Sequence, residues 1–152
     1  MATTYEMPTY AAPARVNVDG HEVRRVVSFT PATWALNDVF KVAKLPLNAK
    51  ITGGWILECP DIDSSTGATV SVIIVDGGTT KTIISGATTP QAGGIVYDSS
   101  ATYGQQTGVL NYKITTTSAY VAVKAAAAAT GTFTAGAFKL QLSYTDGLEF
   151  ND

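Results

Sequence analysis

The chain has 152 residues, a length that fits one domain able to bury a full core. Its formal net charge is −2, which argues against nucleic-acid binding, and no apolar run reaches the 18 residues of a membrane span. Charged residues make up 14%, well under the ~25% of an average soluble domain. Such a surface suits permanent packing against neighbours, although an extracellular-type β-protein with hydroxyl-rich strands is an open alternative. The first residues lack a secretory signal, so we expect folding in a cytoplasm.

Residues 1–20 are predicted to form an extended N-terminal arm. They contain two prolines and show no sustained periodicity, so they would become ordered by lying on another surface. Tyr5, Met7 and Tyr10 are the candidate partner-binding anchors of this arm. A frayed tail with incidental aromatic residues is the alternative.

The stretch from Asp38 to Cys59 is predicted to form two strands that the rest of the chain packs around. Pro46 cannot donate to a strand ladder, so the first strand ends there. The period of two then places one set of side chains on the buried face of the second strand: Ile51, Gly53, Trp55, Leu57 and Cys59.

Alternation of apolar and polar residues predicts further strands along the chain. The Asp76-Gly77-Gly78 turn favours a hairpin. Residues 125–129 are all alanine, but five residues are too few to nucleate a helix, so we interpret them as a strand end. These additional strands are predicted at residues 21–30, 69–75, 79–84, 95–97, 109–115, 119–124 and 138–145.

Residues 85–107 are predicted to form a long loop that contains a single short strand at 95–97. Long loops in compact domains often carry interaction surfaces. Tyr97 and Tyr103 are therefore two further candidate partner-binding residues.

Together these elements predict an all-β fold. About eight strands at even spacing, with no convincing helix, are typical of a two-sheet antiparallel β-sandwich. We favour a jelly-roll-like arrangement, with an immunoglobulin-like sandwich as the alternative. The expected domain organisation is an arm over residues 1–20 and a sandwich over residues 21–152.

No catalytic or metal-binding constellation stands out in the sequence. His21 is the single histidine and Cys59 the single cysteine, which are too few for a zinc site or a nucleophilic triad. Asp61 and Asp63 resemble the start of a calcium loop, but the later ligands of such a loop are missing. We therefore expect no catalytic residue, no metal and no cofactor, and we predict that the protein is not an enzyme.

Several segments resemble small structural proteins of tailed bacteriophages. The resemblance rests on residues 38–55, the Asp76-Gly77-Gly78 turn, residues 119–124 and residues 132–144. The chain is similar in these segments to the head decoration (cement) proteins of such phages, which have jelly-roll-like folds. The resemblance implies a virion protein on the capsid surface, made in the host cytoplasm, that stabilises the capsid lattice. Its implied partners are the major capsid protein and copies of itself, as a homotrimer or other small oligomer, with no nucleic acid and no membrane.

The sequence leaves a second class of function open. A phage fibre or tail component could use the 85–106 loop as a receptor- or carbohydrate-binding module. In that case the rings of Tyr97 and Tyr103 would stack on a sugar.

Overall fold

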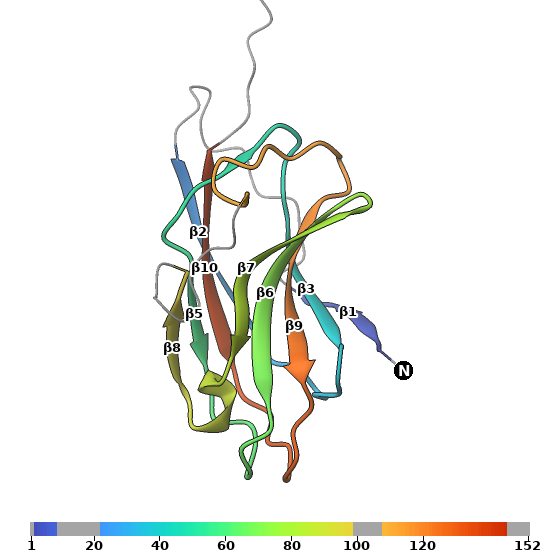
Figure 1. Cartoon of the computed structure of the whole chain (residues 1–152), viewed down its shortest axis with the longest axis vertical. Helices are drawn as coiled ribbons and strands as arrows, with labels where there is room; N and C mark the ends of the chain where they lie inside the picture. The colour runs from blue at the N-terminus through green and yellow to red at the C-terminus, as the bar shows by residue number, and fades with distance from the viewer. Residues whose placement is uncertain (1, 9–21, 99–107, 146–152) are drawn as a thin grey trace, which may run out of the picture.

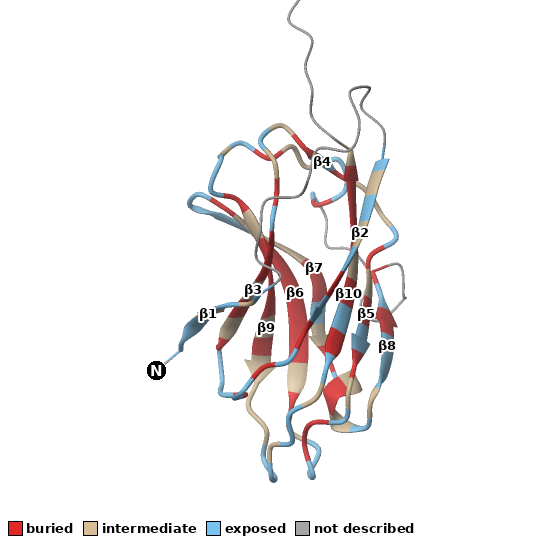
Figure 2. Cartoon of the chain, turned by 180° about the vertical axis from the view of Figure 1, so that it is seen from behind, coloured by how far each residue is buried: buried red, intermediate tan, exposed pale blue. Residues whose placement is uncertain are grey.

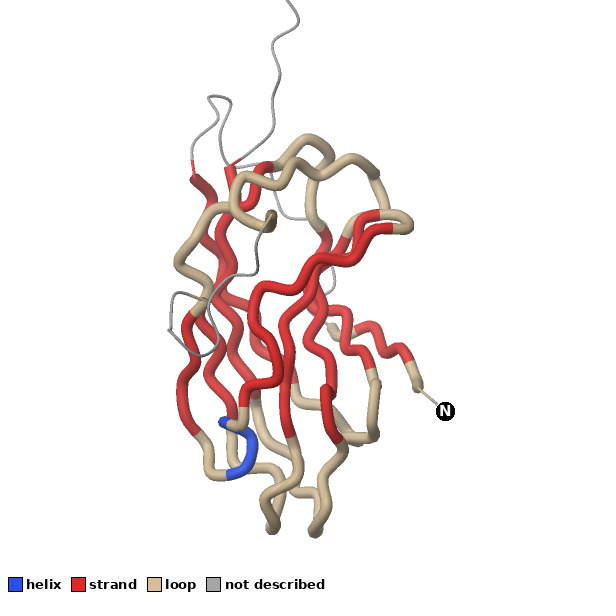
Figure 3. Tube along the Cα trace, in the orientation of Figure 1, coloured by secondary structure: helices blue, strands red, loops and turns tan. Residues whose placement is uncertain are grey.

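The strands assemble into two stacked sheets in the computed structural model, which describes residues 2–8, 22–98 and 108–145. Figure 1 shows the two layers, and Figure 3 shows strands along most of their length with loops gathered at the two ends. The helix found within these described ranges is one short 3-10 turn, η1 (Thr89–Gln91). The prediction of an all-β, two-sheet sandwich is confirmed.

Sheet I has five strands, and neighbours in its order are hydrogen-bonded. All pairings within it are antiparallel except the first, in which β1 runs parallel to β3. The order across the sheet is β1 (Thr4–Glu6), β3 (Val39–Lys44), β9 (Tyr120–Ala127), β6 (Thr69–Asp76) and β7 (Thr79–Ala87).

Sheet II packs against sheet I and is antiparallel throughout. The two-residue strand β4 (Lys50–Ile51) also pairs with its strand β10. The order across the sheet is β2 (Glu22–Phe29), β10 (Phe138–Thr145), β5 (Ile56–Cys59) and β8 (Gly94–Tyr97).

The core lies between the sheets and is built mainly from alternate residues of the strands, with adjacent core residues at the irregular positions of β3 and β7. Figure 2 shows buried positions alternating with exposed ones along the strands of sheet II. The predicted inward face of the second central strand is confirmed for Ile51, Trp55, Leu57 and Cys59, which are all buried. Gly53 instead lies in the irregular turn between β4 and β5. Burying each large apolar side chain contributes roughly 1.5–3 kcal/mol.

Two predicted segments differ from the structure. Residues 109–115 do not form a strand but a series of turns, with Asn111 in the left-handed region at φ 62° and one isolated bridge between Lys113 and Lys50. The loop predicted from residue 85 begins later, because β7 continues to Ala87 and is followed by η1. The predicted short strand at 95–97 is confirmed as part of β8.

The described part of the N-terminal arm lies on its own sandwich. Thr4, Tyr5 and Glu6 pair in parallel with the edge of β3, from Val39 to Lys41. The backbone N–H of Met7 also donates to the carbonyl oxygen of Lys41 at 3.0 Å. The arm's residues 9–20 lie outside the described residues, so the boundary at residue 20 stays a prediction.

The alternation along β10 makes it the clearest test of the core. Leu140 is fully buried, and replacing it with Ala should lower the free energy of unfolding by about 2–5 kcal/mol, because a cavity remains where the side chain was. The measurement is urea denaturation followed by tryptophan fluorescence. The exposed neighbour variant Lys139→Ala should change stability by less than about 0.5 kcal/mol. Equal effects at the two positions would contradict the assigned faces of β10.

Candidate interaction surfaces

Two of the five predicted partner-binding residues contact the chain's own core. The ring of Tyr5 stacks on Phe40, with ring centroids 5.3 Å apart, and its hydroxyl oxygen accepts a hydrogen bond from Thr33 at 3.1 Å. Met7 also packs against the core cluster. Tyr10 lies outside the described residues. A role for these residues in partner binding stays a prediction, and for Tyr5 it would compete with this intrachain contact.

The remaining described candidate, Tyr97, lies on an exposed part of sheet II. It is 47% exposed on the edge strand β8, next to Ile95, which is 52% exposed. Strand register extends this surface inward, because Ile56 of β5 pairs with Tyr97 and is followed across the sheet by Gln141 and then Val26, which is 63% exposed. Tyr103, the fifth candidate, lies outside the described residues.

We call the side chains of Val26, Ile56, Ile95 and Tyr97 the apolar strip; Ile56 is half-buried and the other three are exposed. The same sheet face carries an ion pair beside Ile95, in which Lys139 Nζ is 3.3 Å from Glu58 Oε2. Both of these side chains are about half exposed, so the pair adds little to stability. Its two charges cancel, so the centre of this sheet face combines apolar side chains with no net charge.

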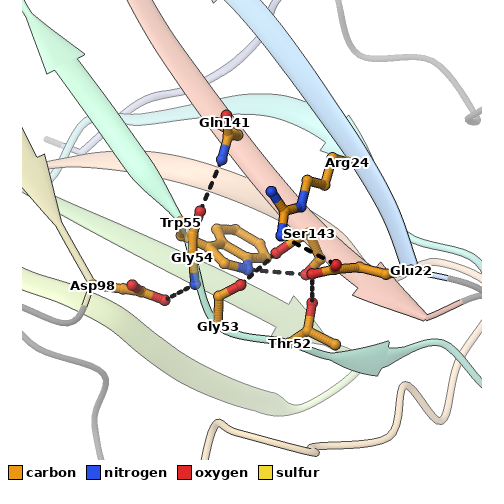
Figure 4. Close-up of polar contacts among 9 residues, drawn as sticks. All are labelled: Glu22, Arg24, Thr52, Gly53, Gly54, Trp55, Asp98, Gln141 and Ser143. Carbon is orange, nitrogen blue, oxygen red and sulfur yellow. Dashed lines mark hydrogen bonds and ion pairs between the residues drawn. The ribbon is translucent and has the colours of Figure 1, made fainter.

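A network of hydrogen bonds fixes the turn that precedes β5 and therefore the position of the strip (Figure 4). Gly54 lies at φ 89°, and its backbone N–H donates to Asp98 Oδ2 at 3.1 Å. Ser143 Oγ donates to the carbonyl oxygen of Gly53 at 2.7 Å, and the indole N–H of Trp55 donates to the carbonyl oxygen of Ser143 at 2.9 Å. The turn is thus held to both β10 and the end of β8.

Asp63 connects two loops, at residues 65–68 and 130–131, at the end of the sandwich that is lower in Figure 1. Its carboxylate accepts hydrogen bonds from five backbone N–H groups, those of residues 65, 67, 68, 130 and 131. Burial alone would raise the pKa of Asp63, but these hydrogen bonds outweigh it and hold the pKa well below its usual range. Both oxygens are therefore engaged by donors, which gives this residue a structural role instead of the cation-binding role considered from the sequence.

Asp76, at the end of β6, connects the hairpin to the turns that replace the predicted strand at 109–115. Its two oxygens accept bonds from the backbone N–H and the hydroxyl of both Thr115 and Thr116, at 2.6–2.8 Å, and from the Tyr112 hydroxyl at 2.9 Å. Burial opposes ionisation here as well, but the hydrogen bonds lower the pKa of Asp76 to about 2.

His21 and Cys59 were considered from the sequence for catalytic or metal chemistry, and the structure describes one of these two residues. Cys59 is buried, and desolvation raises the pKa of its thiol to about 12, so it has little thiolate at neutral pH. His21 lies outside the described residues. Within the described ranges, no group of three or more His, Cys, Asp or Glu side chains is placed to hold a metal ion, and no helix is long and apolar enough to cross a bilayer.

Similarity to known proteins is found at the level of structure. A chain from the capsid of Ralstonia phage GP4 superposes with a TM-score of 0.69 at 20% identity, over 97% of this chain and 100% of that one. A chain from the Cyanophage Pam1 capsid asymmetric unit superposes with a TM-score of 0.56 at 22% identity, over 91% of this chain and 99% of that one. No family model and no curated protein sequence matches the chain. At these identities the likeness establishes a shared fold.

The Asp76 hydrogen bonds predict how stability depends on pH. The unfolded carboxyl titrates near pH 4 and the folded one near 2, so the unfolded state binds more protons in this interval. The contribution of Asp76 is therefore complete above about pH 5 and is lost as the pH falls towards 2.

We expect Asp76→Asn to lower the melting temperature at pH 7 and to reduce the further fall between pH 5 and pH 2. Differential scanning calorimetry across this range measures both effects. Asp61→Asn, at an exposed aspartate, is the matched control. If Asp76→Asn lost as much stability on acidification as the parent, the assignment of this carboxylate would be wrong.

Proposed function

We propose that this protein is a structural component of a tailed-phage virion, a decoration or cement protein that binds the outer capsid surface and stabilises the lattice. The observation that carries the proposal is the shared fold, which extends over nearly the whole length of this chain and of chains from two phage capsids. On this proposal the partners are the major capsid protein and copies of this chain in a homotrimer or other small oligomer, and the protein acts without catalysis.

We further infer that the sandwich is a jelly roll. Apart from β1 and β4, the strands pair in nested order: β2 with β10, β3 with β9, β5 with β8, and β6 with β7. A long β-ribbon folded at β6–β7 and rolled up would produce this pairing. Such a fold exposes two broad sheet faces, each available to a different partner.

We propose the apolar strip as the surface that contacts the capsid. Exposed apolar side chains grouped on one face of a sheet mark interaction sites more often than isolated ones do. The neutral Glu58–Lys139 pair at the centre of the face suits a partner surface that is itself weakly charged. Tyr97 provides an aromatic ring of the kind that dominates binding energy at interfaces.

The role of the apolar strip is tested by measuring how tightly the purified protein attaches to capsids that lack it. Ile95→Ser combined with Tyr97→Ser should weaken attachment at least about tenfold, measured by co-sedimentation of the purified protein with capsids over a concentration series. Leu36→Ser combined with Leu110→Ser, at exposed apolar side chains outside the strip, is the matched control. Wild-type attachment by the strip variant would exclude this face. Binding of wild-type protein to a glycan array, lost in Tyr97→Ala, would favour the carbohydrate-binding alternative.

The arm over residues 1–20 is proposed to reach an adjacent subunit on the particle. Deleting residues 1–20 should weaken capsid attachment and should cost a small amount of stability, because β1 covers part of Phe40. Co-sedimentation measures attachment and thermal unfolding measures stability, so the two effects are read separately. A truncated protein that attaches as tightly as the full chain would show that the arm has no such role.

A further inference from the structure

The edge of β3 is a strand-binding site that the chain's own N-terminal segment occupies. The backbone N–H of Val39 donates to the carbonyl oxygen of Thr3 at 2.8 Å, and the N–H of Met7 donates to the carbonyl oxygen of Lys41 at 3.0 Å. Between these two bonds, the three residues of β1 pair in parallel with β3. The segment is therefore added to sheet I as an extra edge strand (Figure 1).

Side chains at this edge make the site selective for its occupant. The ring of Tyr5 stacks on Phe40, which is 1% exposed. The hydroxyl of Thr33 donates to the Tyr5 hydroxyl oxygen at 3.1 Å. The backbone N–H of Thr3 donates to Oδ1 of Asp38 at 3.1 Å, and this carboxylate is buried. A ring, a hydroxyl and a carboxylate thus recognise the segment in addition to the backbone bonds.

An empty site would expose groups that are costly to leave without a partner. Oδ1 of Asp38 would lose the N–H that Thr3 supplies, and a buried acceptor without a donor costs about 1–3 kcal/mol. Phe40 would lose the ring that stacks on it. The edge of β3 would also present open backbone N–H and C=O groups, which are a template for pairing with another chain. The site therefore favours occupation by a segment of this kind.

The segment itself is held by a small, local contact. Among the strands that the structure describes, β1 pairs with β3 alone. Thr4 and Glu6 stay exposed, and Tyr5 is only half-buried. Terminal strands with few buried contacts open at a low cost in free energy. The segment is thus able to leave its site while the two sheets stay in place.

We propose that the β3 edge binds residues 3–7 of a second copy of this chain in exchange for its own. Every contact described above joins residues 3–7 to residues 33–41, so exchange keeps each contact and changes only which copies it joins. Exchange of identical elements is a low-cost route to association for this reason. The proposal names the surface that receives the arm in the proposed function, and it rests on that function for what places copies side by side.

The balance between the two arrangements depends on local concentration. In dilute solution the chain's own segment holds the site, because its attachment to the same chain gives it the higher effective concentration. Where copies lie next to one another, a neighbour's segment reaches a comparable effective concentration and competes for the same edge. Exchange around a closed ring would then link the copies of a small oligomer.

A peptide tests whether the site accepts a segment that belongs to another molecule. The receptor is the full chain with Tyr5→Ala, which weakens its own segment, and thermal unfolding checks that it is folded. An acetylated peptide of residues 2–8 with a C-terminal fluorophore should bind this receptor in an anisotropy titration. It should bind the wild-type chain at least about tenfold less tightly, because the natural segment fills the site there.

Two variant peptides test the contacts that carry recognition. The peptide with Tyr5→Ala should bind the same receptor at least about tenfold more weakly, because it lacks the ring that stacks on Phe40. The peptide with Glu6→Ala is the matched control. Glu6 makes an exposed ion pair, so its loss should change binding less than about fivefold.

A disulfide trap tests whether exchange occurs between copies. Thr4 and Val39 are register partners on neighbouring strands, which lie about 4.8 Å apart, within the Cα separation that a disulfide bridges. One full-length chain carries Thr4→Cys and another carries Val39→Cys, and the two are mixed at millimolar concentration with the oxidant diamide. A mixed disulfide dimer, identified by mass, should accumulate. Thr4→Cys mixed with Thr82→Cys, on the far edge of sheet I, is the control for random collision.

Three outcomes would each overturn the proposal: no peptide binding at millimolar concentration, equal binding of the natural and Tyr5→Ala peptides, or equal yields of the two mixed disulfides. Both experiments use purified chains without capsids, so their failure leaves the decoration proposal standing. Chains that exchange segments but do not sediment with capsids would instead contradict the decoration proposal alone.

Discussion

A continuous stack of aromatic rings connects the two sheets, and the arrangement of the other elements depends on it. Phe29 of β2 stacks on Phe138 of β10, which stacks on Trp34, then Phe40 of β3 and finally Tyr5 of β1, with successive centroids 5.2–5.5 Å apart. Each such pair contributes about 0.5–1.5 kcal/mol beyond its buried area. Trp34 lies in the connection between β2 and β3, so the stack fixes the point where the chain passes from one sheet to the other.

Buried carboxylates hold the ends of this sandwich, and their use there shapes the surface. Asp38, Asp63, Asp76 and Asp98 are each at most 2% exposed, and each accepts backbone N–H bonds that anchor a loop or turn. The ion pairs on the outer faces use glutamates instead: Glu6 with Lys41, Glu22 with Arg24 and Glu58 with Lys139.

The sequence predicted the elements whose signal is local and missed those that depend on distant partners. The period of two along β10 and the Gly77-Gly78 turn of the β6–β7 hairpin are local, and both were predicted correctly. The strand β1 has no such signal, because three residues at the N-terminus form a strand through parallel pairing with β3, some 35 positions away. Residues 109–115 have strand composition but form turns, since Tyr112, Thr115 and Thr116 donate to Asp76 through hydrogen bonds that no spacing reveals.

The candidate surface was predictable to the same extent. Tyr97 could be named as exposed from its place in a predicted loop region, but its neighbours on the strip could not. Val26 and Ile56 join it because strand register brings β2, β10, β5 and β8 side by side.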